Sequence, residues 1–156
     1  MPRDYRYHVD LDGLIWQGEE SYDEPAIYEM FHRGMARASD GKLFAICQGE
    51  RCWVDPADTP FVVDSVRIAT DAAGAVVGVT LVLKGGIEEP LDPASLSIGE
   101  ANVLYTMVRD GEFPARFSRK AYYELARHIV QTAPGEDQDE EFVLPIGGRR
   151  YPIPGA

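Results

Sequence analysis

Cysteine and histidine are scarce in this sequence. Two cysteines, Cys47 and Cys52, and three histidines occur among 156 residues. A structural zinc site needs four ligands of these types at characteristic spacings, and no H-x-x-x-H or H-E-x-x-H pair occurs. The histidines, His8, His32 and His128, are scattered along the chain. The sequence therefore predicts neither a metal site nor a cofactor.

Long apolar runs are missing as well. The longest apolar segment, 75–83, is interrupted by Gly78 and Thr80 and is far shorter than the roughly 20 residues of a membrane span. Residues 1–7 are charged and aromatic, without the features of a signal or transit peptide. We therefore expect no membrane association and a cytoplasmic location.

An excess of basic residues is also lacking, since the formal net charge is −11. A nucleic-acid-binding protein needs a basic face that displaces the counterions of the phosphates. The charge therefore disfavours a nucleic-acid partner and leaves room only for a local basic patch. No G-x-S-x-G, Walker A or G-x-G-x-x-G motif identifies the chain as an enzyme.

What the sequence does contain fits a single globular domain that spans residues 1–156. Hydrophobic residues make up 45%, an ordinary share. A chain of this length buries roughly two-thirds of the surface that its unfolded form exposes, so it folds without disulfides or metals. No internal repeat and no long linker is visible in the sequence.

Glycine-containing turns divide the chain into short strands joined as hairpins. The turns are expected at Asp12-Gly13, Gly49, Asp110-Gly111 and Gly147-Gly148. Segments 61–70 and 75–83 predict two long strands, and the Gly-, Pro- and acid-rich residues 84–99 predict an irregular connection. An acidic loop is expected at residues 136–141.

Two amphipathic helices complete the prediction. The first is expected to begin with Asp23 as its N-cap and to run to about Arg37, and the second to run from Ser118 to about Gln131. Hairpins without regular β-α-β alternation predict an α+β fold. Its sheet would be mainly antiparallel or split-barrel-like, built of hairpins, with the helices on one face or at one end.

The cysteine pair has two alternative arrangements. If Gly49-Glu50 forms the turn, Cys47 and Cys52 face each other at close to disulfide distance. If Gln48-Gly49 forms it, the register shifts and they do not. Reduced thiols are the favoured interpretation. The enzyme alternative uses Cys47 as nucleophile or Glu50 as general base.

Basic residues surround the start of the second helix, where free N–H groups already favour anions. If this helix end lies close to the 47–58 hairpin, arginines could bind an anion there and carboxylates could orient them. We therefore favour a small-molecule or anion-binding domain with these binding residues: Arg51, Asp58, Arg116, Arg119 and Lys120. Glu50 would help to orient the arginines.

A protein-interaction module is the rival hypothesis. It needs an exposed apolar patch or an unpaired strand edge. Segments 61–63 and 76–83 are the candidates for such a surface, which could also form a homodimer.

Several short motifs occur in a characteristic order. The first is Tyr5-x-Tyr7-x-x-Asp10-Leu11-x-Gly13, and the second is Cys47-x-x-Glu50-Arg51 followed by Asp58-x-Pro60. Weaker matches lie at 123–125 and 148–150. With these motifs the chain resembles an uncharacterised family of small proteins, a domain of unknown function found in bacteria and predicted to be mitochondrial in animals.

The resemblance implies no activity, cofactor or partner, and it directs attention to Glu50, Arg51 and Asp58. The chain departs from the family pattern at Cys52, because family members carry their second cysteine later, where this chain has residues 55–57. A redox pair therefore does not carry over from the family.

Overall fold

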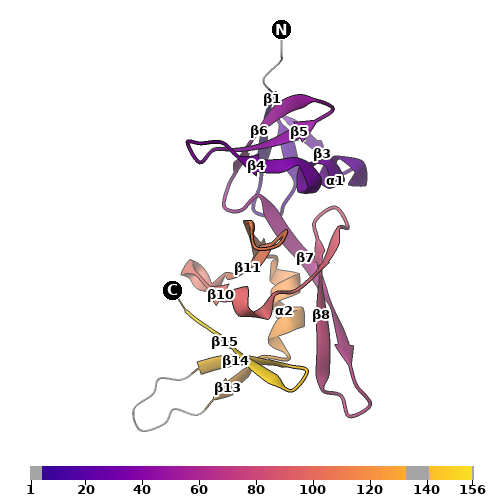
Figure 1. Cartoon of the computed structure of the whole chain (residues 1–156), viewed down its shortest axis with the longest axis vertical. Helices are drawn as coiled ribbons and strands as arrows, with labels where there is room; N and C mark the ends of the chain where they lie inside the picture. Colours follow the sequence, from indigo (N-terminus) through magenta and orange to yellow (C-terminus); the bar gives the residue numbers. More distant parts are fainter. Residues whose placement is uncertain (1–4, 133–140, 156) are drawn as a thin grey trace.

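The computed structural model describes residues 5–132 and 141–155. The described strands form two six-stranded sheets and one three-stranded sheet. Figure 1 shows that the three sheets follow one another along the long axis of the molecule. No described helix is long and apolar enough to cross a membrane.

The first sheet has the strand order β3-β2-β1-β6-β5-β4. Its central strands, β1 and β6, are parallel, and its other neighbours are antiparallel. The helix α1 (Pro25–Gly34) connects the two edges of this sheet. The strand bounds are β1 (Tyr5–Val9), β2 (Ile15–Gln17), β3 (Glu20–Tyr22), β4 (Met35–Arg37), β5 (Leu43–Cys47) and β6 (Glu50–Pro56).

The second sheet has the order β10-β11-β12-β7-β8-β9, again with a central parallel pair, β7 and β12. The helix α2 (Arg119–Ala126) follows β12 and packs along β7. The strand bounds are β7 (Phe61–Thr70), β8 (Val76–Leu83), β9 (Glu88–Pro90), β10 (Ser97–Ile98), β11 (Leu104–Val108) and β12 (Phe113–Phe117). Two 3-10 turns, Pro93–Ser95 and Glu100–Asn102, flank β10.

The two large sheets share one plan of connections. In each, three strands run outward from the centre, the chain crosses to the opposite edge, and three strands return to the centre. The third sheet, β13 (Val130–Thr132), β14 (Glu141–Ile146) and β15 (Arg149–Ile153), is a simple antiparallel meander. The plan repeats in space, although the sequence shows no repeat.

The predicted α+β class is confirmed, and most pairings are the expected antiparallel hairpins. None of the sheets closes into a barrel within the described strands. The parallel pairs at the centres of the two large sheets were not predicted. The predicted acidic loop, apart from Glu141 at the start of β14, lies outside the described residues.

Two details of α1 differ from the prediction. Asp23 is not the N-cap: Glu24 takes that position and makes no side-chain hydrogen bond, with Pro25 in the first turn. The helix ends at Gly34 instead of Arg37, because residues 35–37 pair with β5. A Cβ atom on Gly34 would lie 2.7 Å from the Ile46 carbonyl oxygen, so helix and sheet approach each other closely here.

The start of α2 is as predicted and its end is not. The Ser118 hydroxyl accepts from the Ala121 N–H at 3.1 Å and donates to the Asp64 carbonyl at 3.0 Å, which caps the helix and ties it to β7. The helix ends at Ala126, because residues 130–132 pair with β14 instead of continuing the helix. Pairing in the sheet thus overrides the helical pattern beyond residue 126.

The first hairpin forms as expected, but its turn differs from the expected one. Only Gly13 of the Asp12-Gly13 pair has a positive φ (+88°). The Asp10 carboxylate closes the turn by accepting from the N–H groups of Asp12 and Leu14 and from the Trp16 indole at 2.8 Å. Burial would raise the pKa of Asp10, but these hydrogen bonds lower it below the usual value.

Two glycines bring the first and second sheets together. A Cβ atom on Gly13 would lie 2.8 Å from the Val62 Cβ and 2.9 Å from the Lys84 Cβ. Gly85, with φ +99°, faces the ring of Tyr28 on α1 so closely that a Cβ atom there would overlap the ring. These contacts leave room for hydrogen only, so both positions require glycine.

A polar cluster completes the same interface. The His32 Nε2 atom on α1 and the Glu89 Oε2 atom on β9 lie 2.9 Å apart. The Arg109 backbone N–H donates to Glu89 at 2.9 Å, and its guanidinium donates to the His32 carbonyl at 3.0 Å. Arg109 also lies 4.7 Å from the centre of the Phe113 ring. The cluster links the helix of the first sheet to the edge strand β9 and to the turn between β11 and β12 of the second sheet.

Gly85→Ala should lower the free energy of unfolding by about 2–4 kcal/mol, since it adds overlap with Tyr28 to the cost of a left-handed alanine. Gly86→Ala is the matched control: Gly86 also has a positive φ (+92°), but nothing lies within 4 Å of its would-be Cβ. It should cost only about 1–2 kcal/mol. Urea denaturation measures both, and equal losses would contradict the close contact.

Candidate functional site

Asp58 lies at the centre of a hydrogen-bonded cluster in the segment that joins the two large sheets. Its Oδ2 atom accepts from the Tyr105 hydroxyl at 2.6 Å and from the Arg116 guanidinium at 2.9 Å. The neighbouring Thr59 hydroxyl donates to the Phe61 carbonyl at 2.6 Å and accepts from the Arg116 backbone N–H at 3.0 Å. The segment is thereby fixed to β11 and β12.

This cluster contains two of the predicted binding residues, Asp58 and Arg116. Their side chains are 29% and 18% exposed, so the ion pair is partly shielded from water and still reachable from outside. The Asp58 carboxylate already accepts a hydrogen bond from one N–H group of the Arg116 guanidinium. Arg116 therefore acts first as a fixed partner of Asp58, with its remaining N–H groups available to a ligand.

Glu50 and Arg51 lie at the other end of β6. At about 3.3 Å per residue, some 16 Å of extended strand separates Arg51 from Pro56, and Asp58 lies further along the chain. The structure therefore does not bring Arg51 and Arg116 into one site. The Arg51 guanidinium lies 4.7 Å from the Phe44 ring centre and 5.3 Å from that of Trp53.

Arg119 and Lys120 are exposed on the first turn of α2. Within residues 5–132 and 141–155, no hydrogen bond or ion pair links either side chain to Asp58 or Arg51. The Ser118 hydroxyl already accepts from one N–H of this helix end. Of the three basic residues predicted around the helix start, only Arg116 is therefore bonded to Asp58 in the described chain.

The cysteines adopt the second of the two predicted registers. Gln48 and Gly49 form the turn with positive φ values of 53° and 79°, so Cys47 pairs with Glu50 and Cys52 pairs with Ala45. Both thiols are free. Burial raises the pKa of Cys47 and, together with the neighbouring Cys47 thiol, raises that of Cys52 to about 12. A reactive thiol needs a lowered pKa, so this environment gives no support to Cys47 as a nucleophile.

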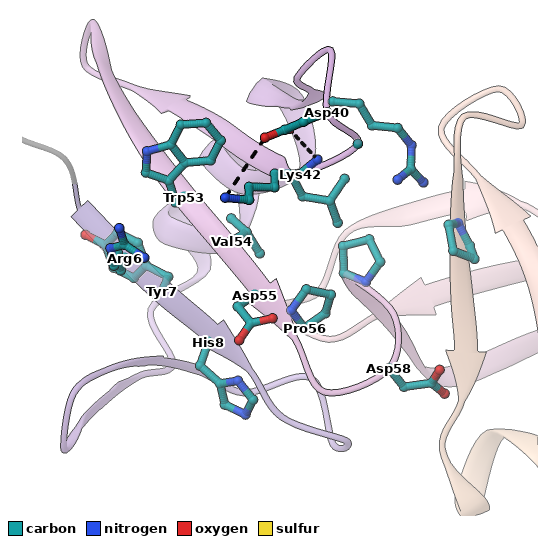
Figure 2. Close-up of a pocket in the computed structure, with 15 residues that line it drawn as sticks. Arg6, Tyr7, His8, Asp40, Lys42, Trp53, Val54, Asp55, Pro56 and Asp58 are labelled. Atoms are coloured by element: carbon teal, nitrogen blue, oxygen red, sulfur yellow. Dashed lines mark hydrogen bonds and ion pairs between the residues drawn. The ribbon is translucent and has the colours of Figure 1, made fainter.

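A groove of about 920 Å³ opens beside the Asp58 cluster. It runs over the outer face of β1 and β6, which is the face turned away from α1, and reaches the junction with the second sheet. Figure 2 shows Trp53, Asp55 and Asp58 along the groove, with Asp40 and Lys42 at one rim. Charged side chains from the first sheet and from the junction therefore meet in one depression, which Pro114 of the second sheet also lines.

The charges that line the groove are mixed. Its lining cations and carboxylates are Arg6, Arg37, Lys42, Asp40, Asp55 and Asp58. Lys42 is paired only loosely with Asp40, at 4.0 Å, and both are exposed. No ion pair holds Arg6 or Asp55 within the described residues. These two side chains are therefore free to meet a ligand.

The parallel pairing of β1 with β6 decides which residues share the groove. Arg6 pairs with Trp53, and His8 pairs with Asp55. On β6 the buried Cys52 and Val54 alternate with residues on the outer face. The alternation in 51–55 was a usable signal in the sequence, but the pairing that places Arg6 next to Trp53 joins distant segments and was missed.

Within the described residues, no group of three His, Cys, Asp or Glu side chains is arranged to hold a metal ion.

No family model matches the sequence, and neither does any curated protein. Two solved structures share the fold. One is a DUF1285 family protein from Silicibacter pomeroyi DSS-3, with a TM-score of 0.66 and 19% identity over 98% of this chain and 83% of that one. The other is a DUF1285 family protein from Shewanella baltica OS155, with a TM-score of 0.60 and 15% identity over 78% of this chain and 90% of that one.

The likeness to these uncharacterised proteins, at such identities, shows the fold alone. It is consistent with the predicted resemblance to a domain of unknown function. The individual motifs quoted above are not tested by it. In this structure Asp10 and Gly13 shape a turn and a close contact, whereas Asp58 fixes the junction of the sheets.

The hydrogen bond to Asp58 raises the pKa of Tyr105, with burial adding to the effect. Tyr105 therefore contributes stability below pH about 10 that is lost as the pH rises through its folded-state pKa.

Asp58→Asn should lower the Tyr105 pKa, because it removes the negative charge and leaves Arg116 nearby. NMR titration of labelled tyrosines measures the pKa, and the signal that is lost in Tyr105→Phe identifies Tyr105. Asp40→Asn is the control, and an equal change of the Tyr105 pKa in that variant would contradict the pairing of Tyr105 with Asp58.

Proposed function

We propose that this chain is a small-molecule-binding domain, and that its site is the groove over β1 and β6. The observation that supports the proposal is that three cations and three carboxylates line one depression of a chain whose net charge is −11, with Arg6 in no ion pair within the described residues. The three cations are Arg6, Arg37 and Lys42, and Asp58 at one end is ion-paired with Arg116. The volume, about 920 Å³, falls in the range of pockets that hold small ligands.

The expected ligand is an anion of metabolite size. Arg6 is the best placed cation because it is exposed and unpaired within the described residues, and a guanidinium binds carboxylate or phosphate through two N–H groups at once. Arg37 is partly engaged, since its guanidinium lies 5.4 Å from the centre of the Phe113 ring. Lys42 adds a mobile positive charge at the rim.

The Asp58 cluster supplies the rigid end of the site. Its three hydrogen-bonded side chains come from the connecting segment, β11 and β12. A ligand that reaches this end meets the Asp58 carboxylate, which is already oriented by Arg116 and Tyr105. The proposal therefore keeps Asp58 and Arg116 as binding residues and replaces Arg51 by Arg6 as the principal cation. Arg119 and Lys120 have no part in this groove.

Within the rival segments 61–63 and 76–83, Val63 and residues 80–82 have strand partners on both sides and offer no free strand edge to an interaction module. β7 pairs with β12 and β8, and β8 pairs with β7 and β9. Phe61, Val62 and Val63 are also buried. Val77 on β8 is 50% exposed, and sedimentation at several concentrations tests whether the chain associates with itself.

A thermal-shift screen with inorganic phosphate, citrate and phosphorylated metabolites tests the proposal. An anion at 100 times its dissociation constant adds about 2.7 kcal/mol, which should raise the melting temperature by roughly 5–11 °C for a domain of this size. Arg6→Ala should remove most of this shift. Arg149→Ala, an exposed arginine on the third sheet, is the control and should keep it. An equal loss in both variants would contradict the groove.

A further inference from the structure

An aromatic row crosses the outer face of the first sheet. Phe44 on β5 pairs with Trp53 on β6, and Trp53 pairs with Arg6 on β1. The two rings meet at an interplanar angle of 66°, with their centres 5.7 Å apart. Both are half-buried although they lie away from α1. Within the described chain this face thus presents aromatic surface that has not been buried in the core.

Cations lie on two sides of Trp53. The Arg51 guanidinium covers part of both rings, and it forms no ion pair within the described residues. Arg6 lies directly across from Trp53 on the neighbouring parallel strand. A stacked arginine keeps its N–H groups in the plane of the guanidinium, where they are free to donate to an anion. The aromatic ring is therefore flanked by two unpaired positive charges.

A carboxylate follows two residues further along the same face. Asp55 is exposed, pairs with His8 in the sheet and has no ion-pair partner in the described part of the chain. Both Trp53 and Asp55 line the groove. An ionised carboxylate accepts hydrogen bonds and donates none, so this end of the groove favours hydroxyl or amino groups over a second anion.

A phosphate, a planar ring and hydroxyl groups occur together in a nucleotide. A base stacks on an aromatic side chain through its π face, arginines bind the phosphate, and a carboxylate binds ribose hydroxyls, as in dinucleotide-binding folds. Building on the proposed function, we infer that the groove binds a free mononucleotide, with its base on Trp53, its phosphate at Arg6 and its ribose hydroxyls at Asp55. Arg51 stacks on Trp53 and Phe44 and does not itself line the groove.

A free nucleotide fits the charges better than a nucleic-acid strand. Three carboxylates line the groove, Asp40, Asp55 and Asp58, and the net charge of the chain is −11. Each further phosphate of a strand would need its own cation to displace counterions. A single phosphate needs only the local positive charge of Arg6.

Isothermal titration calorimetry with AMP, UMP and ribose 5-phosphate tests this inference. The base should make AMP bind about 5- to 150-fold more tightly than ribose 5-phosphate, because one stacked base contributes about 1–3 kcal/mol. Trp53→Leu should reduce the affinity for AMP to that for ribose 5-phosphate, and it should leave the affinity for ribose 5-phosphate unchanged. Trp53→Phe keeps a ring at this position and should retain part of the difference. Phe142→Leu, an exposed ring on the third sheet, is the control and should change nothing.

The outcomes separate this inference from the proposed function. If ribose 5-phosphate binds and AMP binds no more tightly, the nucleotide assignment is wrong and the anion-binding groove stands. If no phosphorylated compound or citrate binds, both fail. Arg6→Ala should weaken AMP and ribose 5-phosphate alike. Tighter binding of a single-stranded oligonucleotide than of AMP would overturn the free mononucleotide in favour of a nucleic-acid partner.

Discussion

The short segment 57–60 determines how the two large sheets are placed, because it joins their central strands, β6 and β7. Its Ala57 N–H donates to the Val9 carbonyl at 2.8 Å, which ties it to β1. Asp58 and Thr59 bind the side chain and the backbone N–H of Arg116, which ties it to β12. The start of the segment, which follows β6, is therefore fixed to β1, the parallel neighbour of β6. Its later part, which leads into β7, is fixed to β12, the parallel neighbour of β7. A partly buried ion pair with a charge-assisted tyrosine partner suits this position, since its geometry is specific even where its net stability is small.

The groove follows from that junction. Because β6 leads directly into it, the outer face of β6 meets the start of the second sheet, and residues from both contribute to one depression. The close contacts at Gly13 and Gly85 hold the same two bodies together on the side of α1. Packing thus fills the inner side of the interface, whereas charged and aromatic side chains remain on the outer side. A site between two rigid sheets needs little rearrangement to bind, which favours affinity for small ligands.

A feature could be predicted from the sequence when residues close together along the chain determine it, and could not when distant segments do. Local turn chemistry predicted the hairpins and the Ser118 cap, and the glycines with positive φ confirm why. The end of α2 at Ala126 and the strand at 130–132 could not be predicted, because a later strand, β14, competes for that backbone. The register of the cysteines was open because the sequence allows two turns, Gly49-Glu50 and Gln48-Gly49, that differ by one residue. The parallel pair β1–β6, which places Arg6 next to Trp53, joins residues nearly fifty positions apart and leaves no local signal.

The net charge illustrates the same limit for function. A total of −11 describes how the whole molecule acts at long range, and it opposes a polyanion that covers many residues. A single phosphate responds to charges within a Debye length of about 8–10 Å, so it meets mainly the side chains of the groove. There Arg6 lies across from Trp53 without a carboxylate partner in the described chain, whereas Asp58 forms an ion pair with Arg116. The net charge therefore favours a small anionic partner over a long polyanion. The pairing of β1 with β6 determines which side chains such a partner would meet.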